Sequence, residues 1–83
     1  MPGRSKQPQS LRTPIAIRVG DAVRALRTQR SISQEELAEL ASLSKNYIGN
    51  IERGEYEVTV SALKQVATAL GCRAADLLDA ADV

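Results

Sequence analysis

The sequence predicts an all-α fold, a compact bundle of about five short helices. Apolar residues recur at helical spacing along most of the chain, and no segment alternates apolar and polar residues as a half-buried strand would. With no Phe, no Trp and two Tyr, the core must be made of Leu, Ile, Val and Ala, which suits packed helices. The 83 residues indicate one small domain, near the size at which a single core is just sufficient.

Residues 1–14 are predicted to form a flexible N-terminal tail, because they hold all three Pro of the chain together with Gly, Ser and Gln. Two roles are open for this tail, a solubilising leader and a binding arm. The domain itself is predicted to span residues 15–83. Its first helix should begin at Ile15 and end near Gln29. The inner face of this helix carries Val19, Ala22, Val23 and Leu26.

A capping box predicts the start of a second helix. The Ser33 hydroxyl can accept a hydrogen bond from the Glu36 amide, and the Glu36 carboxylate can accept one from the Ser33 amide. The inner face of this helix carries Leu37, Ala38 and Ala41. The helix should end around residues 41–43, and Ser44 is a suitable N-cap for a third helix. Two helices joined by about three residues form a helix-turn-helix unit.

Two further helices are predicted after the loop at residues 54–58. Thr59 can cap the fourth helix, and Gly71 can end it as a left-handed C-cap. The inner face of the fourth helix carries Val60, Leu63, Val66, Ala67 and Leu70, and the fifth helix holds Ala74, Leu77, Leu78 and Ala81. Leu77 and Leu78 exceed what one small core can bury and therefore predict a dimerisation surface. Burial of both leucines in the core is the alternative.

The third helix is amphipathic, with an unusual polar face. On a helical wheel its outward side falls within an arc of roughly 140°. This arc carries Lys45, Asn46, Gly49, Asn50 and Arg53, and the other side carries Tyr47, Ile48 and Ile51. A solvated face usually mixes Glu with Lys, but this one has no acid and two amides. Because Asn pairs well with adenine and Lys reaches guanine acceptors, the face predicts contacts with DNA bases.

Charge and residue usage narrow the possible functions. Residues 1–30 carry seven Lys or Arg against one acidic residue, whereas residues 54–83 carry five acidic residues against two basic ones, so the net charge of +1 conceals a basic end that can attract polyanions. The single Cys72 and the absence of His argue against a disulfide framework, a zinc site and acid–base catalysis. We therefore expect no enzyme and no cofactor. The absence of a membrane span or signal peptide in the sequence predicts a cytoplasmic protein.

Three sequence blocks carry a resemblance to a known family. SQEELAELA, LSKNYIGNIERG and LKQVATALG, within residues 17–79, are similar to the phage-repressor and Cro-type helix-turn-helix regulators, also called the xenobiotic-response-element family. The resemblance implies a lambda-repressor-like fold and a transcriptional regulator, such as a repressor, that binds a palindromic DNA operator as a homodimer. Its recognition helix, residues 45–52, would enter the major groove. Small controller proteins of restriction–modification systems are also similar. An antitoxin or adaptor of the same fold, whose main role is to bind a protein partner, is the alternative.

The resemblance also implies roles for individual residues. Base contacts are expected from Lys45, Asn46 and Asn50, with Gly49 on the same arc, and DNA backbone contacts from Gln34, Ser44, Tyr47 and Arg53. Arg27 and Glu52 match a structural ion pair between the first and third helices. Two alternatives stay open. The Tyr47 ring could instead cover the core beside Ile51, and Gly49 could either let the helix sit deep in the groove or simply be tolerated.

The chain departs from the family pattern at three positions. Ser42 stands at the helix-turn-helix corner where Gly is common, which places a non-glycine residue in a left-handed conformation. Val58 stands where Pro is frequent, and Arg73 stands where Ser or Thr often caps the fifth helix.

Overall fold

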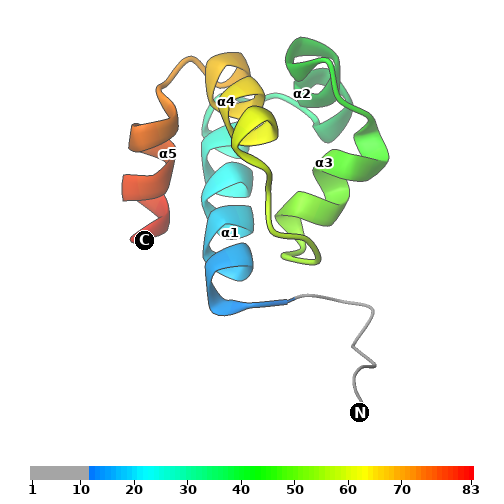
Figure 1. Cartoon of the computed structure of the whole chain (residues 1–83). Helices are drawn as coiled ribbons and strands as arrows, with labels where there is room; N and C mark the ends of the chain where they lie inside the picture. Colours follow the sequence, from blue (N-terminus) through cyan, green and yellow to red (C-terminus); the bar gives the residue numbers. More distant parts are fainter. Residues whose placement is uncertain (1–11) are drawn as a thin grey trace.

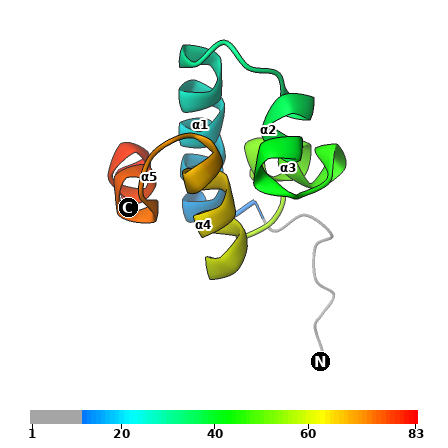
Figure 2. The same cartoon turned by 90° about the horizontal axis from the view of Figure 1, so that it is seen from above.

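The computed structural model describes residues 12–83, which form five α-helices and no strand. The predicted all-α class is therefore confirmed. The helices are α1 (Pro14–Gln29), α2 (Gln34–Ala41), α3 (Lys45–Glu52), α4 (Val60–Ala69) and α5 (Ala74–Ala81). In Figure 1, α1 stands at the centre, with α5 on one side and the α2–α3 pair on the other. Figure 2 shows that α4 lies between α5 and the α2–α3 pair, so that α1 and α4 together hold the helix-turn-helix unit.

The folded domain begins earlier than the sequence predicted. Residues 1–11 of the predicted tail lie outside the described residues. Helix α1 begins at Pro14, which occupies the first helical turn, and the Thr13 side chain caps the helix. Arg12 Nη1 donates to the carbonyl oxygen of Arg53 at 2.8 Å. Arg12 and Thr13 therefore belong to the packed structure, and Arg12 lies against the C-terminal end of α3.

The predicted helix caps are confirmed. Ser33 Oγ accepts a hydrogen bond from the Glu36 amide at 3.0 Å, and Glu36 Oε1 accepts one from the Ser33 amide at 2.7 Å. Ser44 and Thr59 cap α3 and α4 in the same way through their hydroxyl oxygens. Gly71 follows α4 with φ +78°, the left-handed conformation expected at that position. These caps satisfy backbone amides that helix geometry leaves free, and they fix where α2, α3 and α4 begin.

The core lies where α1, α2, α3, α4 and α5 meet, and it is aliphatic as predicted. Its largest fully buried apolar side chains are Leu37, Ile48, Ile51, Leu70, Leu77, Val23 and Val66. Each of the five helices contributes at least one buried side chain to this cluster. The inner sides of α2 and α3 are therefore held on the same core, which fixes the direction in which the outer side of α3 faces.

Two predictions for α4 and α5 are wrong, and one is confirmed. Val60 was expected inside, but its side chain is 83 % exposed because it begins α4 at the edge of the core. Leu77 was expected at a dimer surface, but it is fully buried, so it is unavailable to a partner. Leu78 is half-buried and remains available in part. As expected, Arg73 offers no acceptor to α5, and Asp76 accepts from the Arg73 amide at 3.0 Å instead.

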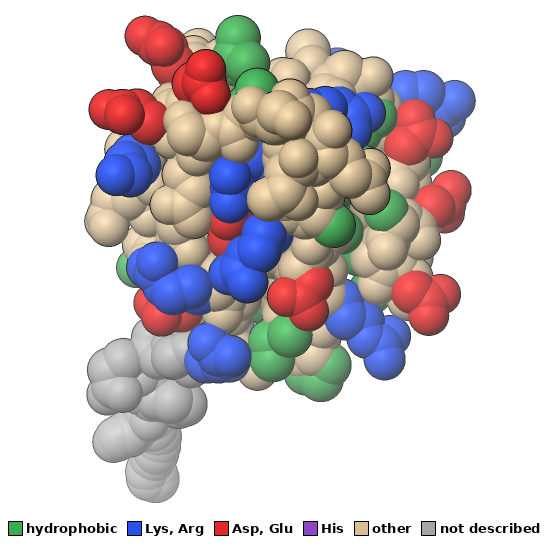
Figure 3. Space-filling view, turned by 180° about the vertical axis from the view of Figure 1, so that it is seen from behind, with side chains coloured by type: hydrophobic (Ala, Val, Ile, Leu, Met, Phe, Trp, Pro, Cys, Tyr) green, Lys and Arg blue, Asp and Glu red, His purple; other side chains and the backbone are tan. Residues whose placement is uncertain are grey.

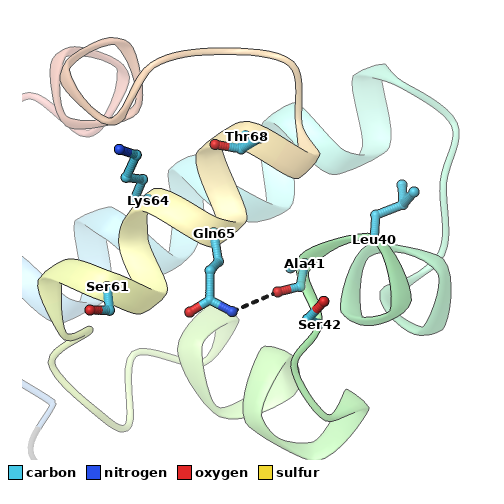
Figure 4. A pocket seen from close by; sticks show the side chains of 7 residues that line it. All are labelled: Leu40, Ala41, Ser42, Ser61, Lys64, Gln65 and Thr68. Carbon is cyan, nitrogen blue, oxygen red and sulfur yellow. Dashed lines mark hydrogen bonds between the residues drawn. The ribbon is translucent and has the colours of Figure 1, made fainter.

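The turn between α2 and α3 is fastened to α4. Gln65 Nε2 on α4 donates to the Ala41 carbonyl oxygen at 2.9 Å, at the end of α2 (Figure 4). Ser42 follows with φ 60° and ψ 40°, the left-handed conformation that the family pattern required. The hydrogen bond satisfies a carbonyl that the end of a helix leaves free, and it holds the start of the turn in place.

Replacing Ser42 by Gly is expected to raise the free energy of unfolding by up to about 1 kcal/mol. A left-handed backbone costs a non-glycine residue roughly 1–2 kcal/mol, and the greater freedom of Gly in the unfolded chain offsets part of the gain. Urea unfolding followed by circular dichroism measures the change. Ser44→Gly is the matched control, because Ser44 is extended and capping, and this change should lower stability by a few tenths of a kcal/mol. A less stable Ser42→Gly variant would contradict the interpretation.

Candidate nucleic-acid interface

The outward side of α3 and the start of α2 form one continuous surface. Lys45 and Asn46 are exposed, and Gln34 reaches the same surface from the first position of α2. Together with Gly49 and Arg53, these residues line a shallow depression. The structure thus brings three of the predicted base-contacting residues, Lys45, Asn46 and Gly49, together with the Gln34 side chain. Asn50, the fourth, is half-buried and does not line the depression. The contacts of these residues with DNA remain predictions.

Basic side chains gather on the side of the molecule opposite to the view of Figure 1. Figure 3 shows Lys and Arg side chains in a band down the middle and lower left of this face, where α1 and α3 lie. Acidic side chains gather toward its upper left and right edges. The Arg side chains of α1 belong to the basic N-terminal part of the sequence, and such cationic groups favour contact with a polyanion.

The end of α3 is anchored by a buried carboxylate. The Glu52 side chain is fully buried, and the predicted ion pair with Arg27 is present: Arg27 Nε lies 2.6 Å from Oε2 and Nη2 lies 3.1 Å from Oε1. Arg27 Nη1 also donates to the Ile32 carbonyl oxygen at 2.9 Å. The hydrogen bond to Glu52 raises the pKa of Arg27, against the opposing effect of burial. The bidentate geometry fixes the orientation of α3 relative to α1.

Gln34 takes part in the same network, which the sequence did not indicate. Its Nε2 donates to Glu52 Oε1 at 3.0 Å, so the start of α2 is bonded directly to the end of α3. Arg24 Nε lies 3.7 Å from the same oxygen and remains half exposed. Gln34 was expected only as a contact to DNA phosphate. No local pattern connects residues that are 18 positions apart and meet only because the two helices cross.

Arg53 lies across the outward side of α3. Its Nη2 donates to Asn50 Oδ1, and its Nε is 3.3 Å from Glu55 Oε2. A Cβ atom at Gly49 would lie 3.1 Å from Arg53 Nη1. The missing side chain at Gly49 therefore leaves the space that the guanidinium occupies. This is an explanation for Gly49 that differs from both sequence-based alternatives.

Tyr47 occupies a position between core and surface. It is half-buried, packs against the core and stacks on Tyr56, with ring centroids 6.4 Å apart and planes inclined by 29°. This packing agrees with the alternative in which the Tyr47 ring covers the core. A contact between the Tyr47 hydroxyl and a DNA phosphate remains a prediction. Ser44 is exposed beside it, and its hydroxyl oxygen accepts from the Tyr47 amide at 3.0 Å.

Other kinds of site find little support between residues 12 and 83. Within this range, no three His, Cys, Asp or Glu side chains come together as metal ligands would. The helices described there are also too short and too polar for any of them to cross a membrane.

Comparisons with known proteins identify the architecture. A helix-turn-helix family model matches residues 23–77, which span α2, α3 and α4, the C-terminal part of α1 and the start of α5. The chain is 45 % identical over 53 residues to the immunity repressor protein of Bacillus phage phi105, covering 64 % of this chain and 37 % of the phage protein. It is 42 % identical over 60 residues to the control protein C.SmaI of Serratia marcescens, covering 72 % and 71 %.

A solved structure shows the same arrangement of helices. The restriction-modification controller protein C.AhdI from Aeromonas hydrophila superposes with a TM-score of 0.73 at 37 % sequence identity, and the match covers 75 % of this chain and 94 % of that protein. The fold described above is therefore that of a known class of regulators.

Proposed function

Because this chain belongs to the helix-turn-helix family of phage-repressor and Cro-type DNA-binding transcription regulators, we propose that it binds a palindromic operator as a homodimer. The observation that supports this most is the outward side of α3, where Lys45, Asn46 and Asn50 lie on a helix oriented by a buried ion pair. In this proposal the protein has no catalytic role, needs no cofactor and acts in the cytoplasm.

The proposed complex places α3 in the major groove. Lys45, Asn46 and Asn50 contact base edges, and Gly49 lies at the groove between them. The backbone contacts come from Gln34 and Ser44, at the positive N-terminal ends of α2 and α3. Tyr47 and Arg53 add contacts at the edges of the helix. Contacts between cationic side chains and phosphate make the affinity fall with salt.

The proposed dimer places two copies of α3 about one helical turn of DNA apart, roughly 34 Å. The Leu78 side chain on α5 is half-buried and borders an apolar depression with Ile15, Val58 and Leu63. Ile15 is 55 % exposed. This depression is the surface that we propose for the partner copy, in place of the buried Leu77.

Selection of bound duplexes from a random pool, near physiological salt, tests the proposal. We expect the wild type to enrich one palindromic site and Asn50→Ala to lose preference at one position in each half-site, because a good base contact contributes about 1–3 kcal/mol of discrimination. Lys64→Ala is the control, since Lys64 is exposed on α4. It should enrich the same site as the wild type.

The same experiment can contradict the proposal in two ways. If no sequence is enriched, α3 does not read bases, and the alternative of a protein partner gains support. If a single half-site without symmetry is enriched, DNA recognition stands but the homodimer does not. Sedimentation equilibrium in the absence of DNA then measures whether the chain associates at all.

A further inference from the structure

The two amides on the outward side of α3 have different hydrogen-bonding states. Asn50 Oδ1 accepts a hydrogen bond from Arg53 Nη2. Asn46 is exposed, and within residues 12–83 its side chain has no such partner. The sequence treats the two residues as equivalent readers of adenine, but the structure makes them chemically distinct.

The bond to Arg53 determines which atom Asn50 presents. A guanidinium has donors and no acceptor, so the amide atom that faces it must be the oxygen. The Nδ2 group of Asn50, with two donor hydrogens, is then the end of the amide left for a base. Arg53 itself also presents only donors. The Asn50–Arg53 pair thus offers hydrogen-bond donors to a base, while the nearby acceptors belong to other residues: Gln34 Oε1 on the far side of Gly49, and Glu55 Oε2 against Arg53 Nε.

The Arg53 side chain is held by Asn50 and Glu55, and its backbone carbonyl is bonded separately by Arg12. Glu55 Oε2 lies 3.3 Å from its Nε, and Arg12 Nη1 bonds its backbone carbonyl at 2.8 Å. The absent side chain at Gly49 leaves room for the guanidinium beside α3, 3.1 Å from where a Cβ would stand. The Arg53 side chain therefore lies over α3 before any DNA is bound. A base that can hydrogen-bond to the side chain in this position avoids the free-energy cost of moving it.

Bases differ in how they meet such a surface. In the major groove guanine presents two acceptors, N7 and O6, whereas adenine presents the acceptor N7 beside the N6 amino donor. Two donors from Asn50 and Arg53 match guanine. Adenine would place its N6 amino group, a donor, against a donor of the protein. The usual bidentate bond between adenine and Asn50 would form only after Arg53 releases Oδ1 of Asn50.

We propose that Asn50 and Arg53 act as one donor-only reader and select guanine at the base pair they face. This rests on the proposed function, because it assumes that α3 lies in the major groove. It changes the role of Arg53 from a backbone contact to a specificity-determining residue, and it changes the base expected opposite Asn50 from adenine to guanine.

The experiment uses the full chain and the site enriched by selection. Asn50→Ala identifies the base position that Asn50 faces, as the position whose preference is lost. Affinities of the wild type are then measured by fluorescence anisotropy for duplexes that carry each of the four bases there. We expect guanine to bind at least about tenfold more tightly than adenine, the usual scale for one well-placed donor pair.

Arg53→Ala then separates the pair from Asn50 acting alone. Without Arg53, Asn50 Oδ1 is free, and the ratio of guanine to adenine affinity should fall to about one or invert, since Asn alone favours adenine. Arg30→Ala is the charge-matched control, because Arg30 is exposed at the end of α1. It should leave the ratio unchanged, whatever it does to the overall affinity.

Adenine preference in the wild type would overturn the proposal, and so would a guanine preference that Arg53→Ala leaves intact. Circular dichroism confirms that the variant is folded. If the Arg53→Ala variant binds DNA too weakly for its affinity to be measured, the base preferred by the wild type tests the proposal: guanine supports it and adenine contradicts it. A failure to enrich any sequence would instead contradict the proposed function, which keeps the two results distinct.

Discussion

Replacing Arg27 by Met is expected to lower the free energy of unfolding by about 3–5 kcal/mol. The change removes the bidentate partner of a carboxylate that is fully buried at the end of α3. Among residues 12–83, Glu52 would keep the hydrogen bond from Gln34 and the more distant Arg24. Burying a charge without a close partner costs several kcal/mol, a large fraction of the roughly 5–15 kcal/mol that stabilises a small domain.

Urea unfolding followed by circular dichroism measures this effect, with two controls. Arg30→Met makes the same substitution at an exposed site on α1 and should change stability by less than about 0.5 kcal/mol. The double change Arg27→Met with Glu52→Leu should recover most of the loss, because an apolar pair can replace a buried ion pair. If Arg27→Met is no more destabilising than Arg30→Met, the ion pair does not hold α3 in place.

Replacing Gly20 by Ala should also destabilise the protein, by about 2–3 kcal/mol. Helix α1 passes so close to the end of α3 that a Cβ at Gly20 would overlap the Ile51 carbonyl oxygen and lie 2.8 Å from that of Glu52. These are backbone atoms, so the contact is relieved only by separating the two helices. The loss should exceed the gain in helix propensity, about 1 kcal/mol for Ala over Gly.

Gly49→Ala is the matched control for this prediction. Its Cβ would meet the end of the flexible Arg53 side chain, which can move aside. Because the same gain in helix propensity applies, this variant should be as stable as the wild type or more stable. Thermal unfolding compares the two variants directly. Equal melting temperatures for Gly20→Ala and Gly49→Ala would show that the approach of α1 to α3 is not as close as described.

The sequence was sufficient for features that depend on neighbouring residues. Apolar spacing gave the helices, and hydroxyl side chains such as Ser33 and Thr59 marked their starts, because a cap is made within one turn. The left-handed conformation of Ser42 was expected from the resemblance to the family, in which Gly is common at that corner. The surface position of Lys45 and Asn46 followed from helical geometry in the same way, since one face of α3 had to be buried.

Contacts that depend on how two helices cross could not be predicted from the sequence in this way. Gly20 looks like an ordinary residue of an amphipathic helix until α3 is placed against it. The bond from Gln34 to Glu52 joins two helices, and the stack of Tyr47 on Tyr56 joins α3 to the following loop. Leu77 was assigned wrongly because adjacent residues on a short helix differ by about 100° in direction, and packing against its neighbours decides which one is buried.

Helix α3 combines residues that anchor it in the core with residues that face outward, and this has a consequence for engineering. Eight residues carry both the anchor, through Ile48, Ile51 and Glu52, and the outward groups at Lys45, Asn46 and Asn50. The two sets share a backbone but differ in burial: the anchor residues are buried, whereas Lys45 and Asn46 are exposed and Asn50 is half-buried. Outward side chains should therefore be exchangeable as a cassette, and libraries randomised at these three positions should yield folded, orthogonal binders from a single scaffold.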